Sequence, residues 1–140
     1  MTQSHFYAKV QAGLPGLVHR LIEHADAPPE RLSMILGDTA RLTGLGDPAD
    51  NPEASTLIHW SQQRPPLWVA RTALFLLIQM PARPTPDGDD EQAAWAYVWL
   101  RMREHESCEA AINALPPYLR FILKKPLETA WADLKGQRLL

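Results

Sequence analysis

The segment HRLIEH, residues 19–24, places two histidines and a glutamate within six residues. In zinc-binding helices, two histidines four residues apart share one face and reach the same ion. His19 and His24 are five residues apart, so at about 100° per residue their side chains diverge by about 140°. Glu23 shares a face with His19, but one His–Glu pair supplies fewer ligands than a zinc site needs. The spacing therefore favours a solvated helix face, and we predict no metal site.

The segment REHESCE, residues 103–109, brings a histidine close to the only cysteine. On a continuous helix His105 and Cys108 would be neighbours, and a histidine base can generate a nucleophilic thiolate. However, Glu104, Glu106 and Glu109 surround the pair, and nearby carboxylates raise the pKa of a thiol by repelling the thiolate. No orienting partner or glycine-rich turn accompanies the pair. We therefore predict a small core cysteine and no catalytic residue.

The acidic segment DGDDE, residues 87–91, lacks the remaining ligands of a calcium-binding loop. Its carboxylates suit the first turn of a helix, with Asp89 or Asp90 as the cap. The chain also lacks a phosphate-binding loop, a dinucleotide fingerprint and a nucleophile elbow. These observations predict a protein that is not an enzyme and has no cofactor.

The segment YLRFILKKP, residues 118–126, interleaves aromatic rings with cations. In sites for single-stranded nucleic acid, rings such as Tyr118 and Phe121 stack on bases while Arg120, Lys124 and Lys125 would neutralise phosphates. Alternatively, the aliphatic residues of the segment pack in the core and the cations favour the C-terminus of a helix. These five residues are our candidate contacts for a partner or for nucleic acid.

Composition describes an ordinary globular protein. The 140 residues suit one domain, residues 1–140, and 46% of them are hydrophobic and 21% charged. The net charge of −2 gives no global electrostatic case for binding nucleic acid. The charge is uneven, because the last forty residues carry seven Lys/Arg against five Asp/Glu, whereas the first hundred carry seven against eleven. The C-terminal third is therefore mildly basic.

Three features bear on location. One cysteine excludes an intrachain disulfide, and the N-terminus has no basic segment followed by an apolar run, as a signal peptide would. The most apolar stretch, residues 67–80, contains Arg71 and is shorter than the roughly 20 residues that a bilayer requires. We therefore expect a cytoplasmic protein without a membrane partner, in which the 66–80 segment is the central core helix.

Proline punctuates the chain and sets the expected helix boundaries. Double prolines at 28–29, 65–66 and 116–117 should each open a helix, because proline is favoured in the first turn and disfavours helical angles in the residue before it. Together with the segment GLPG at 13–16, read as a break, they predict about seven helices. The expected ranges before the tail are up to 12, 15–25, 29–43, 52–62 with Asn51 as cap, 66–80 and 90–106. The tail is expected to hold two or three short helices, over 107–114, 117–125 and 126–135.

Helical periodicity is clearest in the 90–106 segment. Trp95, Val98, Trp99 and Met102 recur at helical spacing, which predicts a core-facing stripe. No segment shows the sustained alternation of a half-buried strand. The predicted fold class is therefore all-α, a compact single-domain bundle of about seven short helices with proline-marked breaks.

Two functions of different classes fit these observations. The first is a non-enzymatic helical interaction module, such as an accessory subunit, an inhibitor or immunity protein, or an assembly factor; five tryptophans favour it, because tryptophan is enriched at interface anchors. The second is a small subunit of a nucleoprotein complex that contacts single-stranded nucleic acid through its basic C-terminal third. Small helical subunits of CRISPR surveillance complexes are of this general kind, but no motif here is specific enough for a family match. We favour docking onto another protein, because the net charge is negative.

Overall fold

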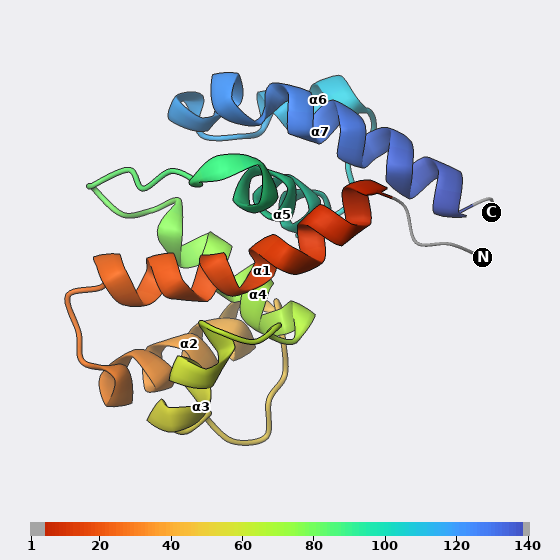
Figure 1. Ribbon diagram of the computed structural model, residues 1–140. Helices are drawn as coiled ribbons and strands as arrows, with labels where there is room; N and C mark the ends of the chain where they lie inside the picture. Colours follow the sequence, from red (N-terminus) through yellow and green to blue (C-terminus); the bar gives the residue numbers. More distant parts are fainter. Residues whose placement is uncertain (1–4, 139–140) are drawn as a thin grey trace. The chain divides into compact units, whose positions relative to one another are not determined.

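The computed structural model describes residues 5–138, and within that range every regular element is an α-helix (Figure 1). The predicted all-α fold with about seven helices is confirmed. The helices are α1 His5–His24, α2 Pro29–Thr43, α3 Ala54–Trp60, α4 Leu67–Leu77, α5 Gly88–Leu100, α6 Cys108–Asn113 and α7 Pro117–Arg138.

The double prolines open helices as predicted. α2 begins at Pro29 and α7 at Pro117, while α4 begins directly after Pro66, whose backbone is extended with φ −60° and ψ 156°. At the other end of α2, Gly44 takes up the left-handed conformation with φ 76°, which ends the helix.

The predicted break at residues 13–16 is wrong, because α1 continues through Pro15. Val10, Leu17 and Leu21 are fully buried on both sides of the proline. Their burial outweighs the lost backbone hydrogen bond and the clash of the proline ring with the preceding turn, which together cost about 3 kcal/mol. Gly13 has a different role from a break: a Cβ at this position would overlap the backbone carbonyl of Asp90, so only glycine permits the close approach of these two segments.

The predicted division of the tail at residue 126 is also wrong. α7 is one helix from Pro117 to Arg138, with Pro126 inside it. Leu119, Leu123 and Leu127 are fully buried at intervals of four residues, so one continuous apolar face runs across the proline. As in α1, packing along a long face overrides a local helix breaker.

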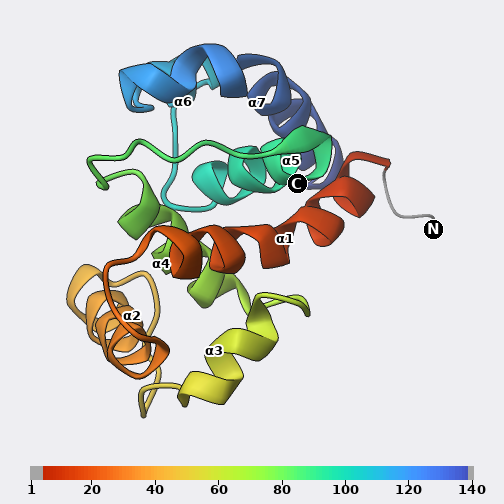
Figure 2. The same cartoon turned by 60° about the vertical axis from the view of Figure 1, so that its left-hand side comes forward.

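The described residues fall into two units, 5–13 with 85–138, and 14–84. In the first unit α7 packs against α5, and α6 lies along α7 (Figures 1 and 2). Every residue of α5 from Ala93 to Leu100 is buried, so this helix is covered on all sides rather than along the predicted stripe. α5 ends at Leu100, short of the predicted 106, and Met102 lies half-buried beyond its end.

In the second unit α2 packs against α3 and α4. Val69, Ala73 and Leu77 of α4 are fully buried, which places α4 in the core of this unit. Arg41 donates hydrogen bonds to the side-chain oxygen of Asn51 at 2.7 Å and to the Pro48 carbonyl at 3.2 Å. The predicted Asn51 cap is therefore wrong, since that side chain holds the loop onto α2 and the N-cap of α3 is Glu53.

Candidate functional site

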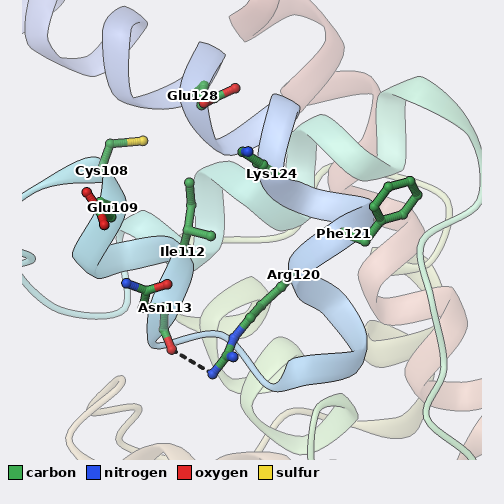
Figure 3. Close-up of a pocket in the computed structure, with 8 residues that line it drawn as sticks. All are labelled: Cys108, Glu109, Ile112, Asn113, Arg120, Phe121, Lys124 and Glu128. Atoms are coloured by element: carbon green, nitrogen blue, oxygen red, sulfur yellow. Dashed lines mark hydrogen bonds between the residues drawn. The ribbon is translucent and has the colours of Figure 1, made fainter.

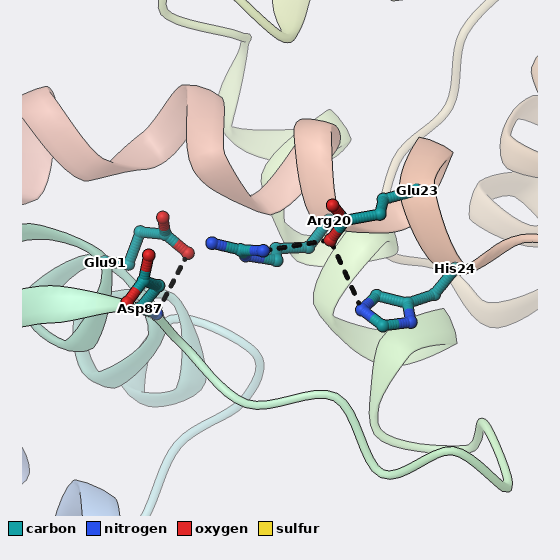
Figure 4. Close-up of polar contacts among 5 residues, drawn as sticks. All are labelled: Arg20, Glu23, His24, Asp87 and Glu91. Atoms are coloured by element: carbon teal, nitrogen blue, oxygen red, sulfur yellow. Dashed lines mark hydrogen bonds and ion pairs between the residues drawn. The ribbon is translucent and has the colours of Figure 1, made fainter.

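The histidine segment lies on α1 and is occupied by contacts among its own side chains. Glu23 accepts a hydrogen bond from Arg20 at 2.9 Å and lies 3.4 Å from the Nε2 atom of His24 (Figure 4). His19 is exposed. Within residues 5–138, no three His, Cys, Asp or Glu side chains are grouped so that they could hold a metal ion. The arrangement is that of a solvated helix face.

The acidic segment forms the start of α5. Asp87 is the N-cap residue, which corrects the predicted Asp89 or Asp90, and the Glu91 side chain accepts a hydrogen bond from the Asp87 backbone N–H at 3.2 Å (Figure 4). Asp89 and Asp90 lie in the first turn, where negative charge favours the helix dipole. These carboxylates therefore stabilise a helix terminus.

His105 and Cys108 are not on one helix, because His105 precedes the first residue of α6, Cys108. The His105 ring lies instead beside the Trp99 ring, with centroids 6.0 Å apart and planes inclined at 32°. Burial lowers the pKa of His105, partly offset by a hydrogen bond to the Trp99 backbone. The Trp99 indole N–H donates to the Ala111 carbonyl at 2.9 Å, so this cluster fastens α6 to α5.

The Cys108 thiol is in an environment that disfavours the reactive thiolate. Burial raises its pKa, and the Glu128 carboxylate raises it further. Its Sγ atom lies 4.0 Å from the Leu127 carbonyl oxygen, to which the thiol donates a weak hydrogen bond. A nucleophilic cysteine needs the opposite setting, with cations that lower the pKa.

The five candidate contacts lie along the first half of α7 in distinct surroundings. Phe121 is 94% exposed, which is the highest value among the large hydrophobic residues described. Lys124 and Lys125 are exposed, and Tyr118 is half-buried. Arg120 donates hydrogen bonds to the Asn113 carbonyl at 2.9 Å and to the Leu115 carbonyl at 3.2 Å, so its guanidinium satisfies the C-terminal end of α6.

A groove of about 660 Å³ lies between α6 and α7 (Figure 3). Its lining side chains are Cys108, Glu109, Ile112, Asn113, Arg120, Phe121, Lys124 and Glu128. We call this surface the α6/α7 groove. Two carboxylates and two cations line it, so its formal charge is balanced, and Phe121 stands at its rim. Sequence reasoning missed Glu109 and Ile112, because only the packing of α6 along α7 brings them into this groove. It missed Glu128 because the predicted division at residue 126 separated this residue from Phe121, whereas both lie on α7.

The tryptophans do not supply the exposed aromatic surface that their number suggested. Trp95 and Trp99 are buried, and none of the five, all of which lie within the described residues, is exposed. Trp60 and Trp68 meet edge to face with ring centroids 6.2 Å apart. Among the residues whose burial is described, the large apolar side chains that are exposed besides Phe121 are Met34, Leu42 and Ile58, of which Leu42 is 87% exposed.

No family model, curated protein or solved structure matches this chain. Among residues 5–138, no helix combines the length and the apolar character that crossing a bilayer would need. The chemistry of the described surface is therefore what bears on function.

Proposed function

We propose that this protein is a small non-enzymatic helical module that docks onto another protein through the α6/α7 groove. The observation that carries the proposal is Phe121, a large aromatic side chain held 94% exposed on a helix whose opposite face is fully buried. Solvating such a ring is unfavourable, and aromatic side chains are common anchors at the centre of interfaces. Accessory subunits, inhibitors and assembly factors work in this way, and the single free thiol of Cys108 accords with a cytoplasmic location.

The side chains capable of acid–base or nucleophilic chemistry support a role in binding rather than catalysis. Glu23 is engaged by Arg20 and His24, and burial moves the pKa of Cys108 away from the reactive range. His105 contacts a tryptophan ring instead of the thiol. A nucleophile and its base need to lie within hydrogen-bond reach of each other, and here they are held in separate contacts.

Binding of single-stranded nucleic acid is the second candidate, favoured by the exposed Lys124 and Lys125 near Phe121. Two features support protein docking over nucleic-acid binding. Arg120 donates to backbone carbonyls of α6, and Glu109 and Glu128 line the same groove, where they would repel phosphates.

The test compares two single substitutions in the tagged full-length protein, recovered from its own cells after mild cross-linking. Phe121→Ala removes the proposed anchor, and Leu42→Ala removes a similarly exposed apolar side chain on α2 as a matched control. We expect specifically bound protein to be lost with Phe121→Ala and retained with Leu42→Ala. Equal recovery with both variants would contradict the proposal.

A titration of the purified protein with labelled single-stranded RNA distinguishes the second candidate. Protein docking predicts no binding that falls steeply as salt rises. Salt-sensitive binding that is lost when Lys124 and Lys125 are changed to glutamate would favour the nucleoprotein function instead.

A further inference from the structure

α7 presents a second regular face besides the one that it buries. Counting along the helix in alternating steps of four and three residues gives Pro117, Phe121, Lys124, Glu128, Trp131 and Lys135, which we call the α7 seam. All are exposed except Trp131, which is half-buried. This alternating spacing aligns side chains along one helix so that they face a neighbouring helix. The seam spans about 27 Å at 1.5 Å per residue.

We propose that the α7 seam pairs antiparallel with the α7 seam of a second copy of this chain. The inference rests on the proposed docking function and names the partner of a surface that shares Phe121, Lys124 and Glu128 with the α6/α7 groove. In the antiparallel register centred on position 126, Phe121 faces Trp131 of the second copy. Lys124 then faces Glu128 of the second copy, and Pro117 faces Lys135. A two-fold axis repeats each contact, as in most homodimers.

Charge selects this register and direction. Lys124 and Glu128 are one turn apart on the seam, so the antiparallel pairing brings each lysine opposite a glutamate in both halves of the interface. A parallel pairing would place Lys124 against Lys124 and Glu128 against Glu128, which is repulsive. The seam therefore carries both members of its own ion pairs, whereas an unrelated partner would have to supply the matching charges.

The aromatic residues of the two seams are also complementary. Phe121 is 94% exposed, and the ring of Trp131 already has the Lys135 ammonium 5.6 Å from its centroid. In the dimer the phenyl ring of each copy covers the other copy's indole, an aromatic pair that removes the most exposed apolar ring from water. Nucleic acid fits this seam less well, because Glu128 lies between its cations.

Sedimentation equilibrium of the full-length protein tests the pairing with reciprocal charge changes. An interface of two helices lies at the small end of protein interfaces, so we expect a dissociation constant in the micromolar range. Lys124→Glu alone and Glu128→Lys alone each place like charges opposite one another twice. We expect each variant to raise the dissociation constant about tenfold, as two reversed surface pairs would.

Restored pairing is the decisive result. An equimolar mixture of the two single variants brings glutamate opposite lysine at both positions, so it should associate as tightly as the wild type, and so should the double variant K124E/E128K. Arg64→Glu is the matched control, because it makes the same charge change at an exposed residue outside α7 and should leave the dissociation constant unchanged. Circular dichroism verifies that each variant remains helical.

Three outcomes would overturn the inference. They are a wild-type protein that stays monomeric at hundreds of micromolar, a mixture that fails to restore association, and an Arg64→Glu variant that weakens association as much as Lys124→Glu. If the chain is monomeric but captures a different protein through Phe121, the inference fails and the proposed docking function stands. If it neither pairs nor captures a protein through Phe121, both fail.

Discussion

Truncation to alanine at two nearby positions of α7 should change the free energy of unfolding by very different amounts. Phe121 is 94% exposed and Leu123, two residues further along, is fully buried. Burying a whole phenylalanine side chain contributes about 1.5–3 kcal/mol, so the small covered fraction of Phe121 contributes only about 0.2 kcal/mol. Alanine is also the better helix former by about 0.5 kcal/mol. Phe121→Ala should therefore change the free energy of unfolding by less than about 0.5 kcal/mol.

Leu123→Ala should instead cost about 2–5 kcal/mol, because it removes buried methyl groups and leaves a cavity. Urea unfolding followed by circular dichroism measures both values. The protein must be dilute enough to prevent association, because any pairing through Phe121 would stabilise the folded state by mass action.

A loss above about 1.5 kcal/mol for Phe121→Ala under dilute conditions would refute the reasoning, since it would mean that the ring is part of the core. A loss below about 1 kcal/mol for Leu123→Ala would equally refute the assignment of the two faces of α7.

Three further predictions concern other parts of the chain. Leu74→Ala or Leu77→Ala should each cost about 2–5 kcal/mol in urea unfolding, since both side chains are buried in α4, and a loss below about 1 kcal/mol at both sites would make α4 peripheral. Gly13→Ala should lower the thermal midpoint although alanine is the better helix former, because its Cβ would overlap the Asp90 carbonyl; a higher midpoint would show that no close approach exists. Burial lowers the pKa of His105, so the folded state binds its proton more weakly than the unfolded state. The free energy of unfolding should therefore keep its full value at neutral pH and decrease as the pH falls below about 6.5. His105→Gln should flatten that part of the stability–pH curve, and an unchanged slope would contradict the assignment.

Local chemistry predicted much of the fold. The double prolines fixed where α2, α4 and α7 begin, and helical periodicity identified α5 as a core helix. The same local reasoning failed at Pro15 and Pro126, where a proline inside a helix is tolerated because buried residues continue on both sides. Gly13 also contributed to the wrong prediction of a break, although its small size in fact permits a close approach to Asp90, a residue far away in the sequence.

The candidate surface could be predicted only in part. The sequence singled out Phe121 and Lys124, but interleaved aromatic and aliphatic residues did not reveal that Phe121 is exposed while Leu119 and Leu123 are buried. That division depends on which side of α7 faces α5. Likewise, Glu109 lies in the α6/α7 groove only because α6 runs along α7, a relation that no sequence spacing encodes.

The docking role of the α6/α7 groove is tested most directly by cross-linking from its rim in living cells. A photoreactive phenylalanine analogue at position 121, compared with the same analogue at position 42, reports what lies against each exposed site. The proposed function predicts strong cross-links from position 121 to protein, including a second copy of this chain, and only weak background from position 42. Cross-links from position 121 that are no stronger than those from position 42, or that go mainly to nucleic acid, would contradict it.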